Sequence, residues 1–177
     1  MTIPDADMPE ETMWEGKWVI ARKRGRWEYV TRARNIRAAV ILPLDGDDVV
    51  LVEQYRVPLG CTCIELPAGL IGDDDGAEDE DPLSAAKREL IEETGYQARD
   101  WTNLGEFYSS PGLVAESYTL LLAKGLEKVG DGGGVEGENI TVHRMARRDV
   151  SRFLAEARAR GAVVDGKMLM LLASDWL

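Results

Sequence analysis

The chain has 177 residues, a net charge of −11 and a pI near 4.6. This length predicts one folded unit, and the acidic balance argues against binding to nucleic acid. The sequence contains no run of roughly eighteen apolar residues, and its N-terminus lacks the basic flank and apolar core of a signal peptide. We therefore expect a cytoplasmic protein that does not associate with membranes. An anionic small molecule would have to be received locally, by metal ions and a few arginines.

The first segments predict a tail followed by a β-hairpin. Residues 1–13 are rich in acid and proline without periodicity, which predicts a disordered tail. Residues 14–22 and 26–32 have the character of strands. We expect residues 14–35 to form N-terminal strands that precede a catalytic domain over residues 36–177.

The middle and end of the chain predict a mixed sheet with helices. Residues 38–44 and 49–55 are apolar runs joined by the turn Asp45-Gly-Asp-Asp, and such continuous runs indicate a sheet covered on both faces. Further strands are expected at 63–71, 101–108, 117–123 and 140–145, and helices at 149–160 and 167–176. This order of elements predicts an α/β (α+β) sandwich.

Residues 83–95 predict a helix with clear ends. Asp81 can cap the helix, Pro82 suits its first position, and Gly95 suits the positive φ that ends a helix. Apolar and small side chains recur at three- and four-residue steps, so one face can be buried. We expect this helix to be the element around which the rest of the chain is arranged.

Three glutamates lie on another face of the same predicted helix. Glu89 and Glu93 are one turn apart and Glu92 lies beside them, so their repulsion calls for a compensating cation. A divalent metal ion is the obvious choice. The alternative is an exposed acidic helix face, on which Arg88 and Glu92 form an ordinary i,i+4 ion pair.

Residues 88–96, Arg-Glu-Leu-Ile-Glu-Glu-Thr-Gly-Tyr, resemble the second half of the Nudix box. Glu80 stands where that family has an earlier glutamate. Gly69 is the match for the family's preceding glycine, and the spacing between the two is longer than the family's. We interpret the difference as an acidic insertion within the loop Asp73–Asp81. The resemblance implies a Nudix-type α/β/α sandwich.

The resemblance narrows to the ADP-ribose (ADP-sugar) pyrophosphatase branch. Pro111 lies sixteen residues after Gly95, within Ser-Pro-Gly, which is that branch's mark, and the runs Glu53-Gln-Tyr-Arg and Ile64-Glu-Leu-Pro-Ala-Gly-Leu-Ile also resemble it. The branch implies hydrolysis of ADP-ribose to AMP and ribose 5-phosphate. Alternatives are another nucleotide sugar such as GDP-mannose, or a non-catalytic nucleotide-sugar sensor.

The resemblance also implies a metal site. Glu89 and Glu93 would be metal ligands together with the backbone carbonyl of Ala68, and Glu92 would lie close by. Arg88 would orient the carboxylates, with Glu80 as its partner or as a further ligand. Hard oxygen ligands suit Mg²⁺, with Mn²⁺ as a substitute, and we expect two to three ions.

The base that activates the attacking water is expected in the glycine-rich segment 130–139. The family's base is a glutamate of this loop, which favours Glu138, with Glu136 as its neighbour and Glu116 as the rival. Glycines around Glu138 would let the loop close over substrate. The alternative is a disordered acidic linker. His143 is the only histidine and falls in a predicted strand, which argues against a histidine-based triad.

The resemblance also implies contacts to the substrate, from the N-terminal strands, from Arg56 and from the loop around Pro111. Trp18 and Trp27 resemble the family's aromatic pair around adenine, and Glu28 resembles its polar contact to the base. In this branch one tryptophan comes from a partner subunit, so the resemblance implies a homodimer. The alternative is two ordinary core tryptophans. The expected phosphate-side and loop contacts are Arg32, Arg56, Pro111, Gly112 and Leu113.

Overall fold

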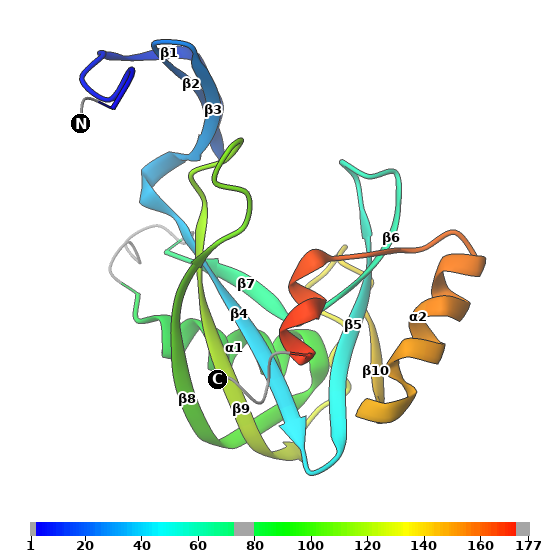
Figure 1. The fold of residues 1–177 in the computed structure, drawn as a ribbon. Coiled ribbons are helices and arrows are strands. Elements are labelled where there is room, and N and C mark those ends of the chain that lie inside the picture. Colours follow the sequence, from blue (N-terminus) through cyan, green and yellow to red (C-terminus); the bar gives the residue numbers. More distant parts are fainter. Residues whose placement is uncertain (1–2, 73–79, 173–177) are drawn as a thin grey trace.

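The computed structural model describes residues 3–72 and 80–172. It begins with a small antiparallel sheet that stands off the main body (Figure 1). Its strands, in the order β1-β2-β3, are β1 (Glu10–Glu15), β2 (Val19–Arg24) and β3 (Trp27–Arg32).

This N-terminal sheet differs from the predicted hairpin in two ways. The expected strand 14–22 is interrupted, because Gly16 turns the chain and its N–H donates to the carbonyl of Val19 at 2.9 Å. The predicted disordered tail is also wrong over residues 10–13, which belong to β1, the strand that pairs with β2. Those residues are charged or exposed, so their strand lacks the alternating apolar pattern from which it could be recognised.

The main body is built on a mixed sheet with the path β11-β6-β5-β4-β9-β8, to which β10 is added beside β5 and β7 beside β4. Parallel pairs join β4 to β9 and β6 to β11, and the other pairs are antiparallel. The strands are β4 (Arg37–Asp45), β5 (Asp48–Arg56), β6 (Cys61–Glu65), β7 (Ala68–Ile71), β8 (Tyr96–Tyr108), β9 (Ser117–Lys128), β10 (Thr141–Ala146) and β11 (Val163–Val164).

The strands β4 and β5 separate soon after their turn. They pair only at Leu44–Val49 and Asp45–Asp48, next to Gly46, whose φ of +61° the predicted turn requires. From Val52 onward β5 pairs with β6, while the other half of β4 pairs with β7. These two central strands diverge from their shared turn (Figure 1).

Helices cover both faces of the sheet, as the continuous apolar strands predicted. The helix α1 (Pro82–Thr94) packs Ala86 and Leu90 against one face. The helix α2 (Val150–Ala159) and the 3₁₀ helix η3 (Gly166–Leu171) pack on the other. This arrangement confirms the mixed α+β sandwich. Two further 3₁₀ turns are η1 (Ala33–Asn35) and η2 (Arg147–Asp149).

The C-terminal helix expected at 167–176 is a short 3₁₀ helix up to Leu171, and the rest of that prediction falls outside the described residues. Most of the acidic insertion, residues 73–79, also lies outside them. None of the helices that the structure describes is long and apolar enough to cross a membrane.

The ends of α1 match the sequence prediction. Oδ2 of Asp81 accepts a hydrogen bond from the N–H of Ser84 at 3.1 Å, and Pro82 occupies the first turn. Gly95 ends the helix with a φ of +70°, and its N–H donates to the carbonyl of Ile91 at 2.8 Å. Local sequence signals therefore fix where the glutamate-bearing helix begins and ends.

Candidate active site

A cavity of about 420 Å³ lies where β4 and β5 diverge beside α1. We call it the carboxylate cavity because Glu89 and Glu93 of α1 and Glu138 of the loop after β9 all line it. Other parts of its wall come from β3, β4, β5 and β7, through Arg32, Ala38, Gln54, Arg56 and Ala68. The fold thus brings together residues that are more than one hundred positions apart in sequence.

Glu93 is a deeply buried carboxylate of this cavity, with 5% of the residue exposed. Its Oε2 accepts a hydrogen bond from the backbone N–H of Ala68 at 3.0 Å. Burial raises the pKa of Glu93 to about 8, because the charged form loses hydration, and the nearby Glu89 and Glu138 raise it further. The hydrogen bond from Ala68 and the charge of Arg56 act in the opposite direction.

Glu89 lies one helical turn earlier and packs against the backbone of Gly69. A Cβ atom at position 69 would lie 1.9 Å from Cδ of Glu89, so any other residue there would force the Glu89 carboxylate to move from this position. Burial raises the pKa of Glu89 to about 7, against the lowering effect of Arg88, whose Nη1 lies 2.7 Å from Oε1. Glu92 and Glu138 add to the rise.

Arg88 holds the glutamates around α1 in place. Its guanidinium lies 3.5 Å from Glu80, 3.6 Å from Glu92 and 3.4 Å from the carbonyl of Leu70. Glu80 also accepts a hydrogen bond from the N–H of Gly72 at 3.4 Å. Of the two roles expected for Glu80, the geometry favours partner of Arg88. Glu92 forms the i,i+4 ion pair with Arg88 and is half-exposed.

The chemistry of these residues fits a divalent cation with hard oxygen ligands. Half-buried Glu89 and buried Glu93 both have raised pKa values and share a cavity with Glu138, so they carry an electrostatic cost that such a cation would offset. In the described ranges, no three acidic, histidine or cysteine side chains are already grouped as a metal cluster.

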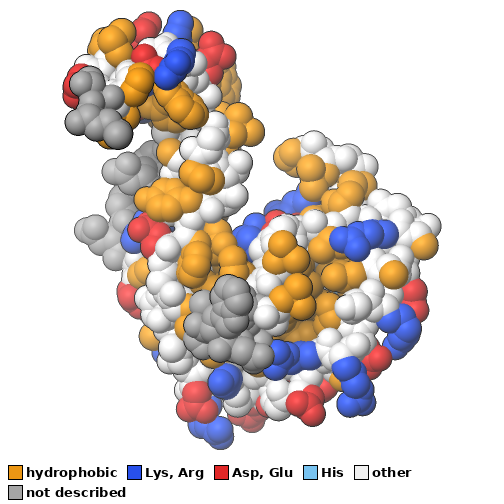
Figure 2. All heavy atoms as spheres, viewed as in Figure 1, with side chains coloured by type: hydrophobic (Ala, Val, Ile, Leu, Met, Phe, Trp, Pro, Cys, Tyr) orange, Lys and Arg blue, Asp and Glu red, His pale blue; other side chains and the backbone are white. Residues whose placement is uncertain are grey.

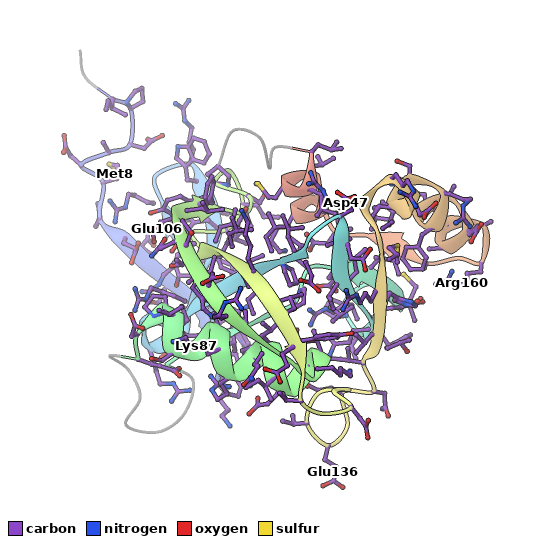
Figure 3. The ribbon with its side chains drawn as sticks, turned by 90° about the horizontal axis from the view of Figure 1, so that it is seen from below. Met8, Asp47, Lys87, Glu106, Glu136 and Arg160 are labelled. Carbon is purple, nitrogen blue, oxygen red and sulfur yellow. The ribbon has the colours of Figure 1, made fainter. Side chains whose placement is uncertain are left out.

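Glu138 and Glu136 occupy different positions in the glycine-rich loop. Glu138 lines the carboxylate cavity, and its Oε2 accepts a hydrogen bond from the N–H of Val135 at 2.9 Å. Glu136 is exposed and points away from the body at the tip of the loop (Figure 3). His143 lies in β10, bonded to Glu53 at 3.0 Å. The geometry therefore favours Glu138 over its neighbour as a base.

Both predicted phosphate-side arginines are paired with glutamates. Arg32 contacts Oε1 of Glu116 through Nε at 2.7 Å and Nη2 at 2.6 Å. Arg56 makes a two-pronged contact with Glu65, at 2.6 and 2.7 Å, which raises the pKa of Arg56. Glu116 is held by Arg32, whereas Glu138 has no arginine among its described contacts, so the geometry favours Glu138 over this rival too.

Trp27 lines a second cavity of about 590 Å³, shared with Tyr29 of β3 and with Pro111 and Gly112. We call it the aromatic cavity. The loop that carries Pro111 is tied to β3, since the N–H of Val30 donates to the carbonyl of Leu113 at 3.0 Å. Leu113 itself is exposed. Of the predicted adenine-side residues, Trp27 thus meets the predicted loop contacts Pro111 and Gly112 at this cavity.

The two predicted adenine-binding tryptophans lie at opposite ends of the N-terminal sheet. Trp27 is paired with Arg24, whereas Trp18 precedes Val19 at the other end of β2, about 20 Å away by strand rise. Exposed fractions of 40% for Trp18 and 51% for Trp27 exclude the core-packing alternative. Lys17 covers the Trp18 ring at 4.6 Å, and Glu28 is exposed on β3. One chain therefore cannot place both rings on one adenine.

Several lining residues of the carboxylate cavity have no counterpart in the sequence-based prediction: Gln54, Glu65, Ser109, Tyr118 and Lys167. Gln54 lies within the run Glu53-Gln-Tyr-Arg, and the resemblance of that run to the ADP-ribose pyrophosphatase branch is a signal that could have pointed to it. Lys167 reaches the cavity from η3, with Nζ 2.6 Å from Asp165. Its place depends on how the C-terminal segment packs, which no local pattern encodes.

Both the sequence and the fold of this chain are similar to those of known proteins. The family model described as NUDIX domain matches residues 34–165. The chain belongs to the Nudix family. A solved structure titled "Crystal structure of ADP compounds hydrolase" superposes with a TM-score of 0.66 and 25% identity, covering 96% of this chain and 91% of that one. The Nudix resemblance and the sandwich fold predicted from the sequence are confirmed.

Related Nudix-type sequences carry several names. A methanol dehydrogenase activator of Bacillus methanolicus is 36% identical over 68% of this chain and 63% of its own length. An ADP-ribose pyrophosphatase of Bacillus subtilis (strain 168) is 40% identical over 50% of this chain and 45% of its own length. A GDP-mannose pyrophosphatase of Cronobacter sakazakii is 35% identical over 78% of this chain and 71% of its own length. The matched region thus spans less than two thirds of the first two relatives.

Proposed function

We propose that this Nudix protein hydrolyses the diphosphate of ADP-ribose, with divalent metal ions, to AMP and ribose 5-phosphate. The observation that carries the proposal is the convergence of half-buried Glu89, buried Glu93 and Glu138 on one cavity that Arg32 and Arg56 also line. Carboxylates for cations and guanidinium groups for phosphate oxygens are the two things a bound diphosphate requires. The ADP-ribose pyrophosphatase and ADP compounds hydrolase among the similar proteins support it.

In this proposal Glu89, Glu93 and the carbonyl of Ala68 hold two to three Mg²⁺ ions, for which Mn²⁺ can substitute. When bound, such ions offset the negative charge that develops on the phosphate oxygens. Arg88 keeps Glu89 oriented through its 2.7 Å contact. Glu138 accepts the proton of the attacking water, since it lines the same cavity from a loop and carries no arginine partner among its described contacts.

The arginine pairs give the same cavity a way to bind phosphate. Arg56 and Arg32 are held by Glu65 and Glu116 at 2.6–2.7 Å. A diphosphate that enters the cavity offers each guanidinium group additional anionic oxygens, and the paired glutamates keep both forks oriented beforehand.

We further propose a homodimer in which adenine stacks between two tryptophans from different subunits, Trp18 of one subunit and Trp27 of the other. The separation of Trp18 and Trp27 along one sheet supports this, because stacked rings must lie within roughly 7 Å of each other. Apolar side chains gather on the N-terminal sheet (Figure 2), and Met13 and Trp14 of β1 are each 59% exposed.

GDP-mannose is the second candidate substrate. The observation in its favour is that GDP-mannose pyrophosphatases match a larger share of this chain, 70–78%, than the ADP-ribose pyrophosphatase does. Relative kcat/KM values on the two nucleotide sugars distinguish the candidates. A non-catalytic sensor is disfavoured because Glu89, Glu93 and Glu138 all face the cavity.

Loss of activity on removal of one metal ligand tests whether the site is catalytic. We expect Glu93→Gln to lower AMP formation from ADP-ribose by at least about 100-fold at saturating Mg²⁺. The exposed Glu106→Gln is the matched control and should retain wild-type turnover. Near-normal turnover of the Glu93 variant would refute the proposal, and tight ADP-ribose binding without any AMP in the wild type would indicate a sensor.

A further inference from the structure

The glycine-rich segment after β9 packs on the C-terminal end of α1. The last carbonyls of a helix have no partner within the helix. Here the N–H of Gly133 donates to the carbonyl of Glu93, and the N–H of Gly134 to that of Glu92, each at 2.9 Å. The segment therefore binds the backbone of Glu93, whose side chain lines the carboxylate cavity, and of its neighbour Glu92.

Lys128, the last residue of β9, adds a side-chain contact at the same place. Its Nζ donates to the carbonyl of Thr94 at 2.9 Å and to that of Asp131 at 3.2 Å, and it lies 4.7 Å from the centre of the Tyr96 ring. A positive charge is favourable at a helix C-terminus. Lys128 thus links the start of the segment to the end of α1.

Direct contact between the two backbones leaves no room for a side chain at Gly132. A Cβ there would lie 2.4 Å from the carbonyl carbon of Thr94 and 2.7 Å from the nitrogen of Gly95, and the φ of Gly132 is +72°. Because the obstructing atoms are backbone, they cannot move aside as a flexible side chain would. We call the contact of residues 128–134 with the C-terminus of α1 the glycine clamp.

The clamp continues to Glu138 through one more hydrogen bond. The N–H of Ile140 donates to the carbonyl of Gly133 at 3.0 Å, which closes a loop that contains Glu138. The path from the backbone of Glu93 to the loop of Glu138 therefore consists of two hydrogen bonds that meet at Gly133. The sequence suggested a loop free to close over substrate, whereas the structure leaves such freedom only between Val135 and Asn139.

We propose that the glycine clamp positions Glu138 relative to Glu89 and Glu93, with Gly132 as the residue on which this positioning depends. The inference rests on the proposed role of Glu138 as base. Gly132 touches no substrate and acts through the loop, so it is a positioning residue. If Gly132 had a purely structural role, replacing it would lower the amount of folded enzyme. The loss of kcat caused by Glu138→Gln would then be the same with and without the Gly132 substitution.

A double-mutant comparison tests the proposal. We expect Gly132→Ala to lower kcat by roughly 10- to 100-fold with KM and the Mg²⁺ midpoint almost unchanged, because small misplacement of a reacting group has effects of this size. Combined with Glu138→Gln, the change should add less than about 2-fold, since both variants remove the same contribution. An equal loss in both backgrounds, or wild-type kcat in Gly132→Ala, would overturn the proposal.

Gly161→Ala serves as the matched control, because Gly161 also has a positive φ of +91° but nothing lies within 4 Å of its Cβ position. It should keep wild-type kcat. If Gly132→Ala does not fold, Lys128→Met takes its place in the same comparison, and Lys128→Arg should restore most of the lost kcat. An additive effect of Lys128→Met with Glu138→Gln would then overturn the proposal.

Hydrogen exchange separates a failure of the clamp from a failure of the proposed function. The amides of Gly133 and Gly134 should exchange slowly in the wild type and in Gly161→Ala, and faster in the clamp variant. This readout does not depend on the substrate. If no AMP forms in the wild type but the exchange pattern holds, the proposed function fails while the clamp stands as a physical contact. Fast exchange of both amides in the wild type would contradict the clamp itself.

Discussion

The backbone N–H of Ala68 donates a hydrogen bond to Oε2 of Glu93 across 3.0 Å. This bond joins β7 to α1 at the carboxylate cavity, and it stabilises the charged form of a side chain that burial makes hard to ionise. Glu93 in the metal-free protein is therefore close to the balance between its neutral and charged forms near neutral pH.

Replacing Glu93 by glutamine should leave the metal-free fold intact. Glutamine resembles the neutral form of Glu93, which the raised pKa of about 8 favours at pH 7. We expect the Tm of metal-free Glu93→Gln to equal or exceed that of the wild type, while Mg²⁺ raises the Tm of the wild type more than that of the variant. A clearly lower metal-free Tm in the variant would contradict the assigned protonation.

The stabilisation by Mg²⁺ should grow with pH. The folded-state pKa values of Glu89 and Glu93, about 7 and about 8, lie above the unfolded value of 4.5. Between these values the unfolded chain has released its protons while the folded chain keeps them, so these two groups reduce stability as pH rises from about 4.5 to 8. Cations bind the ionised groups and compete with their protons.

Thermal unfolding at pH 6 and pH 8.5, with and without Mg²⁺, measures this linkage. The increase in Tm caused by Mg²⁺ should be larger at pH 8.5, and Glu93→Gln should reduce the difference between the two pH values. An Mg²⁺ effect of the same size at both pH values would show that these carboxylates do not bind the ion with release of protons.

The two glutamates of the glycine-rich loop should respond differently to the same substitution. Glu138→Gln should lower kcat by roughly 10²- to 10⁴-fold, the usual contribution of a general base. Glu136→Gln should have no effect, because Glu136 points into solvent at the loop tip (Figure 3). Values of kcat measured at saturating Mg²⁺ distinguish the roles of the two glutamates. Equal losses of kcat in both variants would exclude Glu138 as the specific base.

Arg56 and Glu65 should be coupled in stability. Glu65 is 4% exposed, so Arg56→Met would leave a buried carboxylate without its partner and should cost about 3–5 kcal/mol of unfolding free energy. Adding Glu65→Met should recover most of this loss but not the activity, since Arg56 serves phosphate binding in the proposed function. Denaturant unfolding and kcat/KM of the single and double variants test both statements, and restored activity in the double variant would exclude that role.

Trp27 should contribute to substrate binding rather than to catalysis. Trp27→Ala should raise the KM for ADP-ribose by roughly 3- to 10-fold, since an aromatic stacking contact contributes about 0.5–1.5 kcal/mol. Equal KM values for the wild type and the Trp27 variant would remove Trp27 from the binding site.

The parts of the fold that the sequence predicts are those set by local signals. The capping residues Asp81 and Gly95 define α1, and Gly46 defines the β4–β5 turn, because each acts on backbone within a few residues. The closeness of Glu89 and Glu93 follows from the same helix. The clustered carboxylates could therefore be predicted from one short stretch of chain.

The parts that could not be predicted depend on distant register and packing. The Arg32–Glu116 pair spans 84 residues and is set by how the loop after β8 pairs with β3. Lys167 reaches the cavity only because η3 packs across the sheet. The predicted tail became part of β1 because partner strands, rather than its own exposed side chains, define it.

The central claim is tested most directly by kcat/KM of the purified protein on ADP-ribose and GDP-mannose, each with and without Mg²⁺. We predict AMP and ribose 5-phosphate as the products of ADP-ribose, strict dependence on the metal ion, and a higher kcat/KM for ADP-ribose than for GDP-mannose. Hydrolysis of GDP-mannose with the higher kcat/KM, or formation of no AMP from ADP-ribose at any Mg²⁺ concentration, would contradict the account.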